Sequence, residues 1–132
     1  MEFPVVRGQA LEQTTDEELQ EFLESNKCLE RGDYPAILSR WWEVFGRDQV
    51  FVGLYDDISE RPAELLERIC RFLGVQEPVP IPEESLKERV FAGTPRSLPE
   101  PSRRFLEATY DKVFVERVGE MIEIDLVRRW GY

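Results

Sequence analysis

The chain has 132 residues, 42% of them apolar and 33% charged, which suits one globular domain with a modest core. Twenty-seven acidic residues against 17 basic ones give a net charge of −10. That charge argues against a nucleic-acid backbone or an anionic membrane surface as the main partner. Since no run of 18 apolar residues and no basic-apolar leader occurs, we expect a cytoplasmic protein without a membrane span.

The cysteines and the missing histidines limit the metal chemistry of the chain. Cys28 and Cys70 lie far apart without a Cys-x-x-Cys partner, and the sequence contains no histidine. The usual zinc and haem ligand sets cannot be assembled from these residues. We therefore expect two reduced, structural thiols and no metal site.

The first predicted helix begins after Thr15. Thr15-Asp16-Glu17-Glu18 fits a capping box, in which the Thr15 side chain accepts from a backbone amide and Glu18 reaches back to the amide of Thr15. We expect this helix to continue to about Lys27. Its apolar side chains form only a narrow stripe, so most of its surface should face solvent.

The second predicted helix is Tyr34–Phe45. Asp33 is placed to cap it, Pro35 lies in its first turn, and Gly46 supplies a stop. Its apolar residues recur at helical spacing and include two adjacent tryptophans. This pattern predicts a deeply buried helix.

A strand is predicted next, over Gln49–Tyr55. The run is almost continuously apolar and is interrupted only by Gly53, which is typical of a strand covered on both faces in a parallel sheet. A further helix should begin at Pro62 and end at Gly74.

The rest of the chain is predicted to be linker and helix. Prolines mark a linker over 75–82 and a loop over 91–102, with a short helical piece between them near 83–89. A long helix should begin near Pro101, with Phe105, Val113 and Phe114 on one face. We expect it to break near Gly119 and to leave a last turn or two that ends at Trp130.

The predicted inventory is therefore about five helices and one convincing strand. A lone strand is not stable, because its amides and carbonyls need a ladder once its faces are buried. The other candidate, Phe3–Arg7, contains Pro4, which restricts it to an edge or a strand end. Hence either the strand pairs with a second copy of the chain through Val50–Tyr55, or the rest of its sheet lies outside these residues.

The order of these features resembles a known family. The run GDYPAILSRWWEVFGRDQVFVGLYDDISERPAELLERICRFLGV is similar to the C-terminal half of the sulfotransferases that use 3′-phosphoadenosine 5′-phosphosulfate. The shared pattern is a Gly-x-Tyr before a Trp-bearing helix, an apolar strand ending near Tyr55-Asp56-Asp57, a helix begun by Pro62, and a Phe-Leu-Gly stop. Asp56 stands where the family usually has Glu, and Ile58 where it has Leu. The resemblance covers about residue 30 to the end.

The resemblance implies an α/β fold, namely the mostly helical, C-terminal part of a P-loop-type sandwich to which the Gln49–Tyr55 strand adds. It implies a single partial domain over 1–132. Its segments are an acidic-helix segment (1–29), a helix-strand-helix core (30–74), a proline-rich linker and loop (75–100) and C-terminal helices (101–132).

The resemblance also implies an activity: transfer of a sulfuryl group to a hydroxyl or amine, on a small-molecule or glycan acceptor. The chain has no Gly-rich loop with Lys and Ser/Thr to cradle the 5′-phosphosulfate, and no histidine to act as the base. We therefore expect no catalytic residue in the chain and no activity without a missing N-terminal half. The alternative is a non-enzymatic interaction module or a homodimerising remnant of the same scaffold.

The candidate cofactor contacts are Arg96 and Ser97, in the loop Gly-Thr-Pro-Arg-Ser-Leu-Pro. The family brings a basic residue over the bound nucleotide at this place, and a guanidinium there can fork onto phosphate oxygens. Thr94 and Pro95 stand where the family often has Lys and Gly, so Arg96 is either a cofactor contact or an ordinary surface residue.

Three further sets of residues have two interpretations each. Asp56 and Asp57 either form a metal or acid/base site at a strand end, or one of them caps the turn into the Pro62 helix and the other is solvated. The tryptophans, which are Trp41, Trp42 and Trp130, either line an acceptor pocket or belong to the core. Arg103 and Arg104 oppose the helix dipole and so serve an anion or a neighbouring acid.

Overall fold

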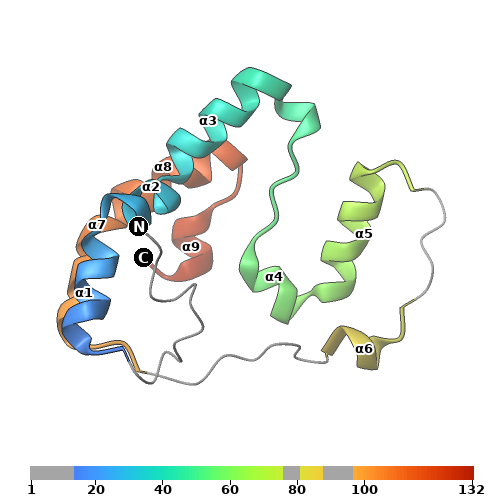
Figure 1. The fold of residues 1–132 in the computed structure, drawn as a ribbon. Helices are drawn as coiled ribbons and strands as arrows, with labels where there is room; N and C mark the ends of the chain where they lie inside the picture. The colour runs from blue at the N-terminus through green and yellow to red at the C-terminus, as the bar shows by residue number, and fades with distance from the viewer. Residues whose placement is uncertain (1–13, 76–80, 88–96) are drawn as a thin grey trace. The chain divides into compact units, whose positions relative to one another are not determined.

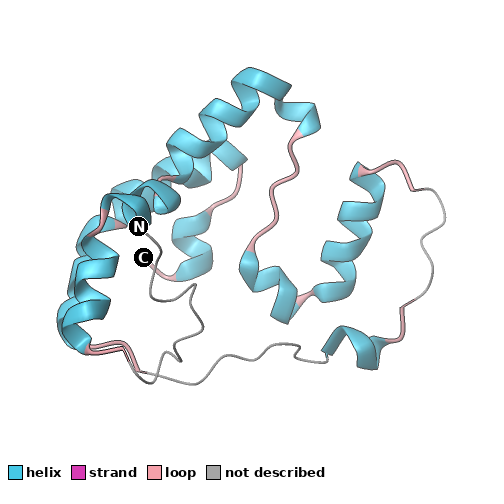
Figure 2. Cartoon of the chain, viewed as in Figure 1, coloured by secondary structure: helices cyan, strands magenta, loops and turns pink. Residues whose placement is uncertain are grey.

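The computed structural model describes residues 14–75, 81–87 and 97–132, and the regular structure in them is helical (Figures 1 and 2). The elements within this described part are α1 (Asp16–Glu24), α2 (Asn26–Gly32), α3 (Tyr34–Phe45), the 3₁₀ helix η3 (Arg47–Gln49), α4 (Tyr55–Glu60), α5 (Pro62–Phe72), α6 (Glu83–Lys87), α7 (Glu100–Thr109), α8 (Lys112–Ile122) and α9 (Leu126–Trp130).

The predicted strand at Gln49–Tyr55 is wrong, and with it the α/β fold class, since the described residues contain no strand. Gln49 ends η3, and Tyr55 begins α4. Between them the chain is extended, with φ −122° and ψ 109° at Val50 and φ −87° and ψ 140° at Leu54. A strand needs a neighbouring backbone for its ladder, and the described residues bring none to this segment.

The chain divides into two compact units, residues 1–40 with 93–132 and residues 41–92. In the first unit α1 packs against α7, and α8 against α9. The buried apolar side chains of this unit are Val115, Val118 and Leu126. A buried polar contact joins α1 to α7, where the Ser102 hydroxyl donates to Gln20 Oε1 at 2.7 Å.

The predicted start of the first helix is confirmed. The amide of Glu18 donates to Thr15 Oγ1 at 3.2 Å, and the amide of Thr15 donates to Glu18 Oε2 at 2.8 Å. The helix ends at Glu24 rather than near Lys27. Ser25 caps a second helix there, because its hydroxyl oxygen accepts from the Cys28 amide at 3.3 Å.

The bounds of the second predicted helix are also confirmed, since α3 spans Tyr34–Phe45 and Asp33 Oδ1 accepts from the Ala36 amide at 3.2 Å. The expected deep burial is wrong. Pro35 is its buried residue, whereas the side chains of Trp41 and Phe45 are 51% and 53% exposed. These two rings stack on each other, with centroids 5.2 Å apart. Helical spacing places them on one face, but it supplies nothing to cover that face.

In the second unit α5 begins at Pro62 and ends at Phe72, as the proline and Gly74 predict; Gly74 has φ 74°. α4 and α5 contact each other, as do α5 and α6. α6 confirms the short helical piece in its described part. The predicted strand candidate at 3–7 and most of the predicted linker and loop lie outside the described residues.

The predicted long C-terminal helix is divided into two. α7 ends at Thr109, and Asp111 caps α8 by accepting from the Phe114 amide at 2.9 Å. The expected break lies a little later than Gly119, which is buried within α8: the helix ends at Ile122, and Glu123 follows it in a left-handed conformation. The final helical turns are confirmed as α9.

Candidate functional site

Asp57 is the most buried charged side chain in the described residues, with 2% of its surface exposed. It lies in the first turn of α4. Arg61 Nη2 donates to its Oδ1 at 2.8 Å, and Arg68 Nη1 donates to its Oδ2 at 3.2 Å. One carboxylate therefore holds two guanidinium groups, one from the residue before α5 and one from within α5.

This geometry explains Asp57 without catalysis. A buried carboxylate is costly unless it is paired and hydrogen-bonded, and both Asp57 oxygens have a donor. Asp56, the residue before Asp57, is half-buried. Among the described residues, no three His, Cys, Asp or Glu side chains gather where they could hold a metal ion. The arrangement does not fit the capping interpretation either, because no side-chain hydrogen bond caps the start of α5; Asp57 is instead paired with Arg61 and Arg68.

Arg68 also connects the extended segment Val50–Leu54 to α5. The Arg68 guanidinium carbon lies 5.5 Å from the centroid of the Phe51 ring, and that ring is 5.5 Å from the Phe72 ring. Leu54, at the end of the segment, is 9% exposed. Aromatic and cation–π contacts thus hold Val50–Leu54 in its extended form against α5.

None of the three tryptophans is buried in the described structure. Trp41 and Trp130 are 51% and 44% exposed, so neither is a core residue. Trp42 is half-buried, and the Arg47 guanidinium lies 4.2 Å from its ring centroid. That contact places the ring at the end of α3, where it covers the turn into η3.

Of the two predicted cofactor contacts, Arg96 lies outside the described residues. Ser97 is exposed and precedes α7 by three residues. Two basic residues in the first turns of α7 face a neighbouring acid, because Glu100 lies 2.9 Å from Arg104 Nε and 4.0 Å from Arg103 Nε. Both pairs are exposed and worth little in stability.

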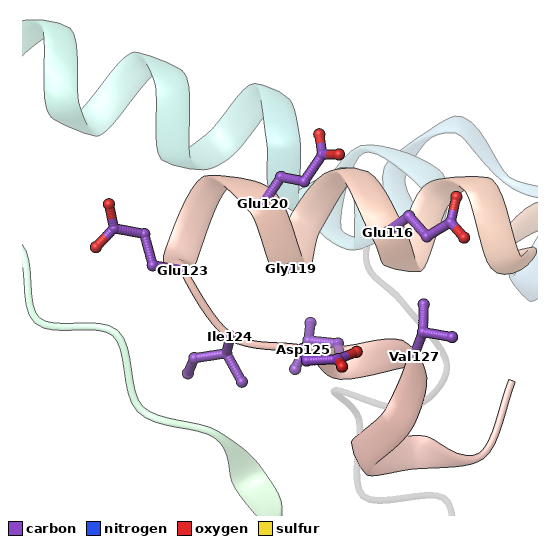
Figure 3. A pocket seen from close by; sticks show the side chains of 8 residues that line it. Glu116, Gly119, Glu120, Glu123, Ile124, Asp125 and Val127 are labelled. Carbon is purple, nitrogen blue, oxygen red and sulfur yellow. The ribbon is translucent and has the colours of Figure 1, made fainter.

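A pocket of about 460 Å³ lies between the end of α8 and the start of α9. Four carboxylates line it, from Glu116, Glu120, Glu123 and Asp125. Figure 3 shows that they do not point toward one common position. An anionic donor such as a phosphosulfate would be repelled here. The sequence analysis did not single out these residues, because acidic residues spaced along a helix are ordinarily solvated.

The comparisons with known proteins identify the family. A family model described as the sulfotransferase domain matches residues 6–92, which is well over half of the chain. The protein therefore belongs to the sulfotransferase domain family, as the sequence resemblance predicted. The match begins earlier than that resemblance and ends before α7. Neither the curated proteins nor the solved structures gave a match.

Among the helices in the described part of the chain, none is both long enough and apolar enough to cross a membrane.

Proposed function

We propose that this chain takes part in the transfer of a sulfuryl group from 3′-phosphoadenosine 5′-phosphosulfate to a hydroxyl or amine on a small-molecule or glycan acceptor. The observation that carries the proposal is the family match over residues 6–92. The free thiols of Cys28 and Cys70 fit a reducing compartment, and we place the reaction in the cytoplasm.

The phosphate cradle comes from a separate polypeptide segment in this proposal. The 132 residues contain no Gly-rich loop ending in Lys and Ser/Thr, and no histidine to take the proton of the acceptor. In this scheme 1–132 is one partial domain, and its function is to complete the site rather than to form it alone.

Arg96 and Ser97 are the residues with which the chain contacts the cofactor in this proposal. A guanidinium can donate two parallel hydrogen bonds to phosphate oxygens, and these strengthen as negative charge develops during sulfuryl transfer. The net charge of −10 makes a local basic residue necessary for an anionic ligand. The exposed Ser97 hydroxyl is accessible to donate beside it.

Calorimetry with adenosine 3′,5′-bisphosphate tests this proposal. The chain alone should bind weakly or not at all, whereas a fusion to a segment that carries the P-loop should bind. In the fusion, Arg96→Ala should weaken binding by about ten- to a hundredfold, the value of a charged hydrogen bond. The matched control is Arg104→Ala, whose side chain is paired with Glu100, and it should leave the affinity unchanged.

Two results would contradict the proposal. Stoichiometric micromolar binding by the 132 residues alone would show that the cradle is already present in them. Equal affinities of the Arg96→Ala fusion and the parent fusion would remove Arg96 from the site.

A second candidate function is a non-enzymatic interaction module that pairs with another copy through the Val50–Tyr55 segment. The exposed apolar side chains of Trp41, Phe45, Tyr55 and Ile58 favour it, because monomeric proteins rarely expose so many large apolar groups without a partner.

A further inference from the structure

The first two helices of the chain are too short to be stable alone. α1 has nine residues and α2 has seven, and neither contains a buried residue, although the structure describes both completely. Isolated helices shorter than about 12–15 residues are marginal in water, because their few hydrogen bonds do not offset the cost of nucleation. The stability of α1 and α2 must therefore come from contacts with other elements.

For α1 those contacts come from the C-terminal part of the chain. α1 packs against α7, and Figure 1 shows the two helices side by side. The contact includes a polar pair, because the hydroxyl of Ser102, a residue that is 1% exposed, donates to Gln20 Oε1 at 2.7 Å. A buried hydroxyl that loses its partner costs free energy, so this pair favours one position of α7 along α1.

The other end of α7 contacts α2. Gly32 is the last residue of α2, and a Cβ built on it would collide with the hydroxyl oxygen of Tyr110, the residue that follows α7. Burial raises the pKa of the Tyr110 phenol, and Cys28, one turn earlier in α2, raises it further. α7 thus contacts α1 near its start and α2 at its end.

The segment that makes these contacts also carries the core. Within the described part of the first unit, the buried residues lie in 97–132, with Pro35 as the exception. α8 and α9, which hold Val115, Val118 and Leu126, pack against each other. The segment 97–132 therefore has buried residues of its own, whereas α1 and α2 have none. It also lies beyond residue 92, where the family match ends.

We infer that residues 97–132 act as a strap, a C-terminal segment outside the family match that holds α1 and α2 in the fold and whose release unfolds both helices together. α1 and α2 are ordered only while α7 is docked on them. Part of the family-matched region is thus controlled by residues that lie outside it. This role of the strap does not depend on sulfuryl transfer.

Native-state hydrogen exchange of the full chain in low concentrations of urea tests the inference. The amides of α1, α2 and α7 should open as one unit, with the same dependence of exchange on urea, because all three helices are short and lose their packing when α7 undocks. α5, which belongs to the second unit, should open with a different dependence. Protection of α7 without protection of α1 would overturn the inference, and so would a single opening that α5 shares.

A variant at the contact between α1 and α7 tests the coupling directly. Ser102→Ala removes the hydrogen bond to Gln20, so it should speed amide exchange in α1, α2 and α7 by a common factor of roughly two- to tenfold, the value of one hydrogen bond. It should leave α5 unchanged. Arg104→Ala is the matched control on the same helix, because this side chain is 76% exposed and pairs with Glu100 within α7. It should leave exchange in α1 and α2 unchanged.

Circular dichroism verifies the helix content of both variants. An effect of Ser102→Ala that is confined to α7 would show that α1 and α2 stay folded without the strap. Equal effects of the two variants on α1 would remove the Ser102 contact from the coupling. Either result would overturn the inference.

Discussion

The phenol ring of Tyr110 occupies the space beside Gly32 in which any other residue would carry its side chain. A Cβ built on Gly32 would lie 2.6 Å from Tyr110 Cζ and closer still to the hydroxyl oxygen. Gly32 is the last residue of α2, and Tyr110 follows the last residue of α7. The contact therefore joins two helix ends that are far apart in the sequence.

The first prediction is that Gly32→Ala destabilises the protein, although alanine is the better helix former. The methyl group must displace the Tyr110 ring, and such overpacking costs roughly 1–3 kcal/mol. Urea unfolding measures the loss. In a double-mutant cycle, Tyr110→Leu should recover much of it, because the ring that clashes is gone. A Gly32→Ala protein as stable as the parent would show that the ring does not fill this space.

The second prediction concerns alkaline pH. Burial raises the pKa of the Tyr110 phenol above its ordinary value of 10.0, and the neighbouring Cys28, Tyr34 and Asp33 raise it further. The folded state thus keeps this proton to a higher pH than the unfolded state does. Its contribution to stability is complete below about pH 10 and is lost as the pH rises through the folded pKa.

Tyr110→Phe has no proton to lose, so its stability should fall less steeply with pH above 10 than that of the parent. Urea midpoints at several alkaline pH values measure the slope. Tyr132→Phe, which changes a half-exposed phenol at the chain terminus, is the matched control and should keep the parent slope. If the urea midpoints of Tyr110→Phe and of the parent fell equally with pH, the raised pKa of Tyr110 would be contradicted.

The sequence predicted local structure better than packing. The Thr15 capping box, the Asp33 cap and the proline start of α5 are confirmed because their signals lie within one helical turn. The strand is wrong because an apolar, β-branched run describes an extended backbone as well as a paired one. Whether a ladder forms depends on a distant segment, which no local pattern reveals.

The contacts around Asp57 show the same difference between local structure and packing. The spacing of Asp57 and Arg61 is that of a helical ion pair, but the sequence analysis predicted no helix between Tyr55 and Pro62 and so missed this contact. Arg68, eleven residues beyond Asp57, reaches the same carboxylate only because α4 and α5 pack together. The motif order identified the family because it combines many local signals. The exposure of Trp41 was not predictable, since helical spacing selects a face without saying what covers it.

The third prediction is that Asp57→Asn loosens the α4–α5 pair. The change leaves two guanidinium groups without their carboxylate. We expect a loss on the order of 1–3 kcal/mol, below the value for a fully buried pair because the Arg61 and Arg68 side chains are 47% and 34% exposed. Amide exchange within the two helices measures it. Glu64→Gln removes an exposed partner of the same Arg61 and should change amide exchange little. Equal effects of the two variants would contradict the larger role assigned to Asp57.

The fourth prediction compares two valines on α8. Val115 is 3% exposed and Val113 is 69% exposed, whereas the sequence analysis grouped Val113 with Phe105 and Phe114 on one helix face. Val115→Ala should cost roughly 1.5–3 kcal/mol through lost burial and the cavity left behind. Val113→Ala should be neutral or slightly stabilising, because alanine favours helix. Denaturant midpoints measure both, and a larger loss at Val113 would mean that α8 is rotated about its axis.

The last prediction is a stabilising substitution at the end of α8. Glu123 has φ 59° and ψ 37°, the left-handed conformation, and is the non-glycine residue in the described chain with positive φ. Its amide donates to the Gly119 carbonyl and closes the helix, so the backbone must keep this shape. Glycine adopts it without the Cβ penalty of roughly 1 kcal/mol. Glu123→Gly should therefore raise stability by about that amount, whereas Glu120→Gly, in the helix interior, should lower it by a similar amount. Thermal unfolding of the two variants measures both shifts. A destabilised Glu123→Gly protein would show that the Glu123 carboxylate contributes more stability than the left-handed conformation costs.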